Sequence, residues 1–141
     1  MVQLFATGKE ITATTSSHIT DVSQYGVQEG GVLSSTSITG FTITNNTGGF
    51  SWMRVYVTIP NLIPGQQYAV TFTTGGVALT IFSIRPNGLN WTWGGSPLHY
   101  ASNPYTFSTT FIATQSTAVL QFWDNGLQPN GTTWNISDLS V

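Results

Sequence analysis

The sequence predicts an all-β protein built as an antiparallel two-sheet jelly-roll sandwich. Apolar and polar residues alternate along many short segments, and glycine or proline turns separate these segments. No window combines the apolar spacing of an amphipathic helix with a credible cap. The clearest example is residues 50–74, where two alternating runs flank a turn at Pro64-Gly65. Many short strands at this spacing are typical of two packed antiparallel sheets.

Most of the expected strands have an alternating run of their own, bounded by turn residues such as Gly30-Gly31, Gly75-Gly76 and Asp124-Asn125-Gly126. The expected strands cover residues 2–6, 10–15, 32–45, 51–59, 67–74, 77–84, 105–113, 117–123 and 133–141. Residues 1–30 alternate weakly and are predicted to form an N-terminal arm or edge segment, with the sandwich itself over 31–141. Residues 86–104 are too irregular for one strand and are predicted to form a long loop.

The composition excludes several classes of function. The chain has 141 residues, enough for one domain, and it contains no cysteine for disulfides or thiolate metal sites. Three basic residues are too few for a duplex-binding surface, and no apolar run is long enough to cross a membrane. The first ten residues lack the basic region and apolar core of a Sec-type signal peptide. We therefore expect neither nucleic-acid binding nor membrane insertion.

Charged residues make up only 6% of the chain, and Ser, Thr, Asn and Gly replace them. Proteins commonly use charge to stay dispersed and to protect exposed strand edges. The low charge therefore predicts that subunits or partners cover the edges, although Thr-rich β-proteins can also be soluble monomers.

Three segments carry short motifs in a fixed order. Residues 55–72 hold a leucine, then Pro64-Gly65, then a tyrosine that opens an alternating strand; residues 105–122 hold two further alternating runs; and residues 134–141 form a closing aliphatic strand. Together they resemble the carbohydrate-binding-module class of jelly rolls, particularly the copies in phage tail and virion proteins. Residues 4–9 resemble the opening of modules in phage tail proteins. The resemblance implies the jelly-roll fold and a binding or structural role.

Aromatic residues suggest a carbohydrate-binding site. Trp91 and Trp93 are two residues apart and would present neighbouring rings on one side of an extended segment. Tyr100 and Trp123 would extend this platform, and Gln121 would hydrogen-bond sugar hydroxyls. The alternative is that these rings pack the loop onto the sandwich. Trp52 and Trp134 are expected to pack in the core or at an edge.

The sequence argues against catalysis and metal binding. A glycosidase needs two converging carboxylates. Five are available, and four of them carry no aromatic-lined context: Glu10, Asp21, Glu29 and Asp138. Asp124 is expected to bond local backbone in its Asp-Asn-Gly turn. The two histidines lack the paired spacing of a zinc site. Members of the resembled family that hold structural calcium tend to have an acid where this chain has Ser137, so we expect neither calcium nor another cofactor.

Two functions remain open. The first is a non-enzymatic virion structural protein, such as a capsid decoration or tail accessory subunit, which contacts other virion subunits or itself as a homo-oligomer. The second is a lectin-like module that binds a cell-surface glycan through exposed tryptophans. The phage-like motifs and low charge favour the first, with the virion as the place of action.

Overall fold

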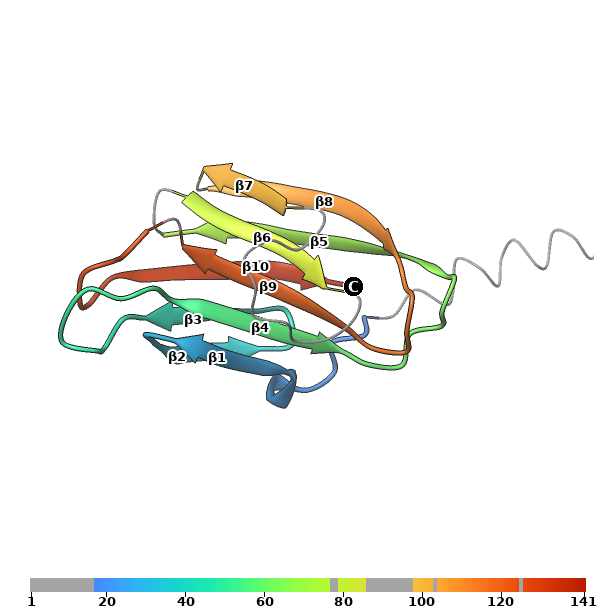
Figure 1. Ribbon diagram of the computed structural model, residues 1–141, viewed down its shortest axis with the longest axis horizontal. Coiled ribbons are helices and arrows are strands. Elements are labelled where there is room, and N and C mark those ends of the chain that lie inside the picture. Colours follow the sequence, from blue (N-terminus) through green and yellow to red (C-terminus); the bar gives the residue numbers. More distant parts are fainter. Residues whose placement is uncertain (1–16, 77–78, 86–97, 103, 125) are drawn as a thin grey trace, which may run out of the picture.

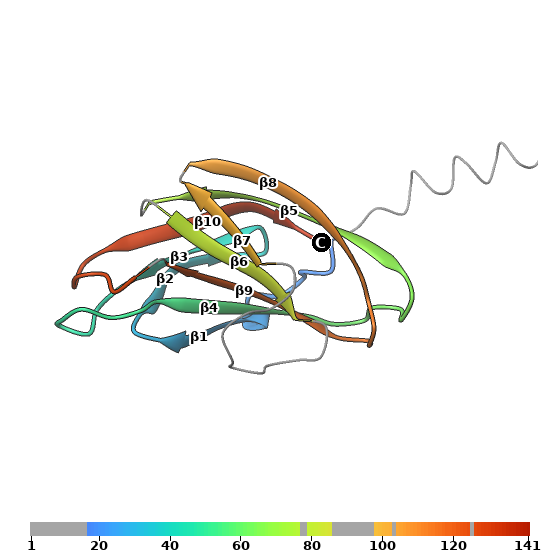
Figure 2. The same cartoon turned by 45° about the horizontal axis from the view of Figure 1, so that its top comes forward.

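Two five-stranded antiparallel sheets face each other in a jelly-roll sandwich, as Figures 1 and 2 show. A computed structural model describes residues 17–76, 79–85, 98–102, 104–124 and 126–141. Sheet A has the strand order β1 (Tyr25–Glu29), β4 (Arg54–Ile59), β9 (Ala118–Asp124), β6 (Leu79–Arg85) and β7 (Leu98–Ser102). Sheet B has the order β2 (Val32–Ser37), β3 (Gly40–Thr44), β10 (Thr133–Ser140), β5 (Gln67–Gly75) and β8 (Tyr105–Ile112). The predicted fold class is confirmed.

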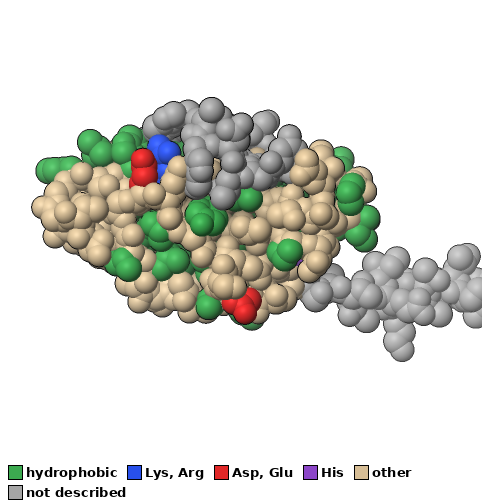
Figure 3. Space-filling model, turned by 60° about the horizontal axis from the view of Figure 1, so that its bottom comes forward, with side chains coloured by type: hydrophobic (Ala, Val, Ile, Leu, Met, Phe, Trp, Pro, Cys, Tyr) green, Lys and Arg blue, Asp and Glu red, His purple; other side chains and the backbone are tan. Residues whose placement is uncertain are grey.

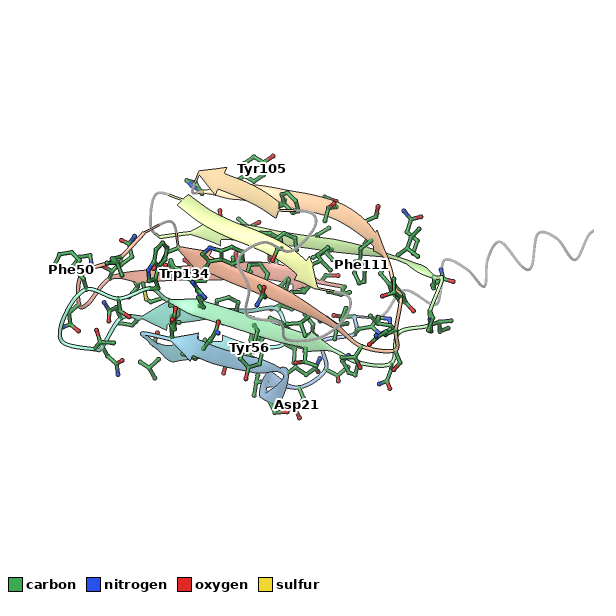
Figure 4. All side chains as sticks on the ribbon, viewed as in Figure 1. Asp21, Phe50, Tyr56, Tyr105, Phe111 and Trp134 are labelled. Carbon is green, nitrogen blue, oxygen red and sulfur yellow. The ribbon has the colours of Figure 1, made fainter. Side chains whose placement is uncertain are left out.

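The core lies between the sheets and is rich in aromatic rings. On β4, Val55, Val57 and Ile59 are buried, which is the period-two pattern expected of a half-buried strand. Phe72 of sheet B and Phe122 of sheet A meet edge to face with ring centroids 5.0 Å apart. Such contacts add stability beyond the apolar area that the rings bury. Trp134 is fully buried at the start of β10, as expected (Figure 4).

The turn between β4 and β5 has the predicted conformation. Gly65 has a φ of 88°, and the Gln66 N–H donates to the Ile63 carbonyl at 3.0 Å. Pro at the second position and Gly with positive φ at the third are the features of a type II turn. The Gly65 N–H also donates to the Ala113 carbonyl at 2.7 Å, so the turn is attached to the chain that follows β8.

Residues 32–45 form a hairpin, β2 and β3, rather than the single expected strand. The chain reverses at Ile38 and Thr39, where the Thr39 N–H donates to the Ser37 hydroxyl at 3.2 Å. Hydroxyl side chains that bond nearby backbone favour turns over continued strand. Strands β1 and β7 are also absent from the predicted strands, since β1 lies within the weakly alternating segment 1–30, predicted as an arm or edge segment, and β7 lies within the expected loop.

The described part of the N-terminal segment packs against the sandwich. The Asp21 side chain caps a one-turn 3-10 helix, η1 (Val22–Gln24), and the Gln24 side chain donates to the Thr58 carbonyl at 2.9 Å. The His18 N–H donates to the Val141 carbonyl at 2.9 Å, and Ile19 is buried. Residues 25–29 then form the edge strand β1. The predicted strands at 2–6 and 10–15 lie outside the described residues.

Candidate functional site

The surface of sheet A that points away from sheet B, here called the A face, carries the candidate site. Alternate residues of its strands belong to the core, so the intervening side chains lie on this outer face. The A face is defined by Arg54, Tyr56, Thr58, Ser83, Gln121 and Trp123. In register, Tyr56 is opposite Gln121, which is opposite Ser83.

Tyr56 is partly exposed on β4, and its ring lies across Gly26 of the neighbouring edge strand β1 (Figure 4). A Cβ atom added at Gly26 would come within 2.1 Å of the Tyr56 Cζ atom. Only glycine therefore fits at position 26 while the Tyr56 ring stays in place. The missing side chain at Gly26 leaves the space in which the Tyr56 ring lies. The ring is an aromatic surface on an otherwise polar strand face.

One ion pair lies beside this ring. The Arg54 Nε atom is 3.3 Å from a Glu29 carboxylate oxygen, and the two side chains are 19% and 47% exposed. A pair with this exposure contributes little to stability. Glu29 is opposite Arg54 on the neighbouring strand, and Arg54 is opposite Trp123, so the pair places charged hydrogen-bonding groups in one row across the sheet with Trp123.

Gln121 and Trp123, two of the predicted binding residues, lie on the A face with little exposed surface, at 8% and 5%. The Ser83 hydroxyl lies 3.5 Å from the Gln121 Oε1 atom, at the limit of a hydrogen bond. The buried Trp123 indole N–H has no acceptor among the described residues. A buried donor without an acceptor is costly and calls for an explanation.

Tyr100, a third predicted binding residue, is in the same row of sheet A as Trp123. Tyr100 is in β7 opposite Ile81 of β6, and Ile81 is opposite Trp123 of β9. The backbone therefore brings positions 100 and 123 into one row of sheet A. Trp91 and Trp93, the residues on which the predicted platform centres, lie outside the described residues.

Asp124 is fully buried at the end of β9, and its contacts extend beyond the expected local ones. Its carboxylate bonds its own backbone N–H, and its Oδ1 atom also accepts a 3.1 Å hydrogen bond from the Met53 N–H, which is distant in the sequence. Burial raises the pKa of Asp124 to about 6, although the Met53 N–H opposes this change. The carboxylate attaches the start of β4 to the end of β9.

The other described carboxylates are dispersed. Asp21 accepts from the Ser23 N–H at 2.8 Å, which lowers the pKa of its carboxyl group, and Asp138 lies on sheet B. Within the described ranges, no group of three or more His, Asp or Glu side chains is arranged to hold a metal ion. In the same ranges, no helix is long and apolar enough to cross a membrane. Most of the described surface in Figure 3 is neither hydrophobic nor charged.

Neither Tyr56 nor its neighbour Arg54 is among the site residues predicted from the sequence. Both alternate with the buried residues of β4, so the alternating pattern of residues 50–74 does indicate that they share the outer face of their strand. What the sequence lacked was the strand order, which brings β1, β4 and β9 side by side.

Solved structures share this fold. The chain is similar to a structure described as "CBM4 structure and function", with a TM-score of 0.51 and 14% identity over 82% of this chain and 84% of that one. It is similar to the module TmCBM61, solved in complex with β-1,4-galactotriose, with a TM-score of 0.51 and 10% identity over 89% and 97%. These identities establish a shared fold only. The chain thus has the jelly-roll sandwich of carbohydrate-binding modules.

A phage protein has the same fold within a larger chain. The enzymatically active domain of tailspike protein 4 from bacteriophage CBA120 matches with a TM-score of 0.54 and 13% identity, over 85% of this chain and 19% of that one. No protein-family model and no curated protein matches this chain significantly.

Proposed function

We propose that the protein is a non-enzymatic glycan-binding module whose ligand lies on the A face. The observation that carries the proposal is the partly exposed ring of Tyr56, fixed over Gly26 amid uncharged hydrogen-bonding side chains and one ion pair. Sugar rings present apolar C–H faces and hydroxyl edges, which match an aromatic surface surrounded by donors and acceptors.

The residues predicted from the sequence extend the same proposal. Trp123 would donate its indole N–H to a sugar oxygen, and Gln121 would bond an adjacent hydroxyl. Tyr100 would contribute from the other edge of sheet A. Trp91 and Trp93 would stack on further sugar rings along the chain of the glycan.

A glycan array tests this proposal with a matched pair of variants. Tyr56→Ala removes the ring on the A face, and Tyr105→Ala removes a half-exposed tyrosine on sheet B. We expect the first to weaken binding about tenfold and the second to leave it unchanged. Wild-type protein that binds no glycan, or equal losses in both variants, would contradict the proposal. Trp93→Ala is the corresponding test of the tryptophan pair.

The arrangement of the described carboxylates supports the absence of catalysis. Glu29 bonds Arg54, Asp124 is buried against the Met53 N–H, and Asp21 caps η1. Hydrolysis of a glycosidic bond needs two carboxylates that flank the bond across one site. Reducing-sugar release from any glycan found on the array would contradict this part of the proposal.

A second candidate is a virion subunit that contacts its neighbours through the edge strand β8. Strand β8 pairs with β5 in unbroken register from Tyr105 to Ile112, has no bulge in that pairing and contains no charged residue. Tyr105 and Ile112 are 50% and 60% exposed. Charges and bulges are the usual protection of an edge, and a flat edge without them pairs readily with another strand. The likeness to the tailspike domain is in fold only and is consistent with this role.

Light scattering tests the second candidate. Thr106→Lys places a charge on β8 and should dissociate a homo-oligomer or release the protein from virion particles, whereas Ser34→Lys on β2 serves as a matched control. A wild-type protein that is monomeric at high concentration and does not bind particles would contradict this candidate. Deletion of residues 1–16 removes the first part of the predicted arm and keeps β1. Loss of the oligomer or of particle binding is the result expected if this part of the arm takes part in assembly.

A further inference from the structure

A polar groove lies on the opposite side of the molecule, on the surface of sheet B that points away from the core. It has a volume of about 230 Å³, and β2, β3, β10 and the turn between β2 and β3 line it. We call it the B groove and define it by Ser35, Ser37, Thr39, Gly40, Phe41, Thr42, Asn135, Ile136, Ser137 and Asp138. We propose that the B groove is a second binding site, which takes a single neutral sugar residue.

The lining determines the class of ligand. Hydroxyl groups predominate, with one amide from Asn135 and one carboxylate from Asp138, and no Lys, Arg or His contributes. A carboxylate without a neighbouring cation repels anions, so phosphates, sulfates and acidic sugars are excluded. Hydroxyl, amide and carboxylate groups together accept from and donate to vicinal sugar hydroxyls. Phe41 is 3% exposed, so stacking contributes little and recognition rests on hydrogen bonds.

The backbone at Asp138 has a left-handed conformation beside the groove. Asp138 has a φ of 52°, which is unusual for a residue other than glycine, and it lies in the irregular part of β10 between Ser137 and Ser140. The Leu139 N–H donates to the Thr39 carbonyl at 2.8 Å and fixes this stretch against the β2–β3 turn. Strained residues of this kind concentrate at binding sites, where the surrounding structure maintains them.

Free hydrogen-bonding capacity and size agree with this assignment. The Asp138 side chain is exposed and makes no hydrogen bond to a described residue. A groove of about 230 Å³ holds roughly eight water molecules, which is room for one pyranose ring but not for an extended oligosaccharide. Gly40 forms part of the floor, because a Cβ there would lie 2.2 Å from the Ile136 carbonyl oxygen.

This inference goes beyond glycan binding on the A face and does not depend on it. The test is an amide-resolved NMR titration of the full chain with the methyl glycosides of glucose, galactose and mannose. We expect saturable shifts at Thr39, Asn135 and Asp138 with at least one glycoside, and none with glucuronic acid. Shifts at Tyr56, Thr58 and Gln121 report the A face separately, so the two sites succeed or fail independently.

Two variants separate the carboxylate from the backbone. Asp138→Asn keeps the shape and tolerates the left-handed conformation, and Asp138→Gly fits that conformation better still. Each should raise the dissociation constant for the B groove about tenfold, since a charge-assisted hydrogen bond is lost. Ser108→Ala, outside the groove on the same sheet, should change nothing. No shift with any neutral glycoside, or unchanged affinity in both Asp138 variants, would overturn the inference.

Discussion

Replacing Asp124 by Asn should stabilise the protein at neutral pH but not at acidic pH. The Asp124 carboxyl is fully buried, and its pKa rises from 3.8 to about 6 on folding. Between these two values the folded protein binds more protons than the unfolded chain, so the free energy of unfolding falls as the pH rises through this range. Asparagine does not ionise, and its Oδ1 atom keeps the acceptor for the Met53 N–H.

The size of this effect follows from the change in pKa. A difference of roughly two units corresponds to about 3 kcal/mol. Solvent screening at the end of the sandwich lowers this to about 2 kcal/mol. We therefore expect Asp124→Asn to match the wild type below pH 4 and to exceed its free energy of unfolding by about 2 kcal/mol above pH 7.

Urea unfolding of both proteins at several pH values between 4 and 7.5 measures this difference. Asp124→Ala is the control: it does not ionise either, but it leaves the Met53 N–H without its acceptor, so it should be about 1–3 kcal/mol less stable than Asp124→Asn throughout the range. A difference between wild type and Asp124→Asn that does not change with pH would refute the reasoning. It would mean that the carboxyl titrates normally in the folded state.

Three further predictions concern glycines and one buried amide. Gly65→Val should cost about 1 kcal/mol, because Gly65 has a φ of 88° but no neighbour to clash with, and Gly65→Asn should cost less; melting temperatures check both. Asn45→Ala should cost about 3 kcal/mol in urea unfolding, because the buried Asn45 amide donates to the Gly49 and Gln128 carbonyls at 2.9 and 2.8 Å and joins two loops. Gly26→Val should displace the Tyr56 ring and weaken glycan binding as much as Tyr56→Ala does; unaltered binding on the array would contradict the assigned role of this ring.

The fold could be predicted where burial imposes a period of two, and it was missed where both faces of a strand are exposed. On β4, one face is core and the other is solvent, so alternation defines the strand directly. Five of the six residues of β2 are exposed, so nothing in its Ser and Thr pattern distinguishes one face from the other. The hairpin turn at Ile38 and Thr39 was therefore not visible in the sequence.

The candidate site depended on long-range pairing that local patterns do not encode. An Asp-Asn-Gly sequence signals a turn, but the Met53 N–H that Asp124 accepts from becomes its neighbour only when β4 pairs with β9. In the same way, Gly26 has no evident role until β1 lies beside β4 and the Tyr56 ring crosses it. Strand order, rather than residue type, creates the A face and the B groove.

The near absence of charge acts on the faces and the edges of this sandwich in different ways. On the faces, the uncharged hydroxyl and amide groups of the two proposed sites would exchange water for sugar hydroxyls at a low desolvation cost, because neutral groups are cheaper to remove from water than charged ones. At the edges, the same composition removes the protection that charged side chains provide: of the described edge strands β1, β2, β7 and β8, only β1 contains an Asp, Glu, Lys or Arg residue, Glu29. Bulges interrupt the pairing of β1 and β2, whereas β7 and β8 pair without one. The low charge on which the proposed glycan sites rest therefore also leaves β7 and the longer β8 as the edges most open to another strand, so the two proposed functions are compatible in one domain.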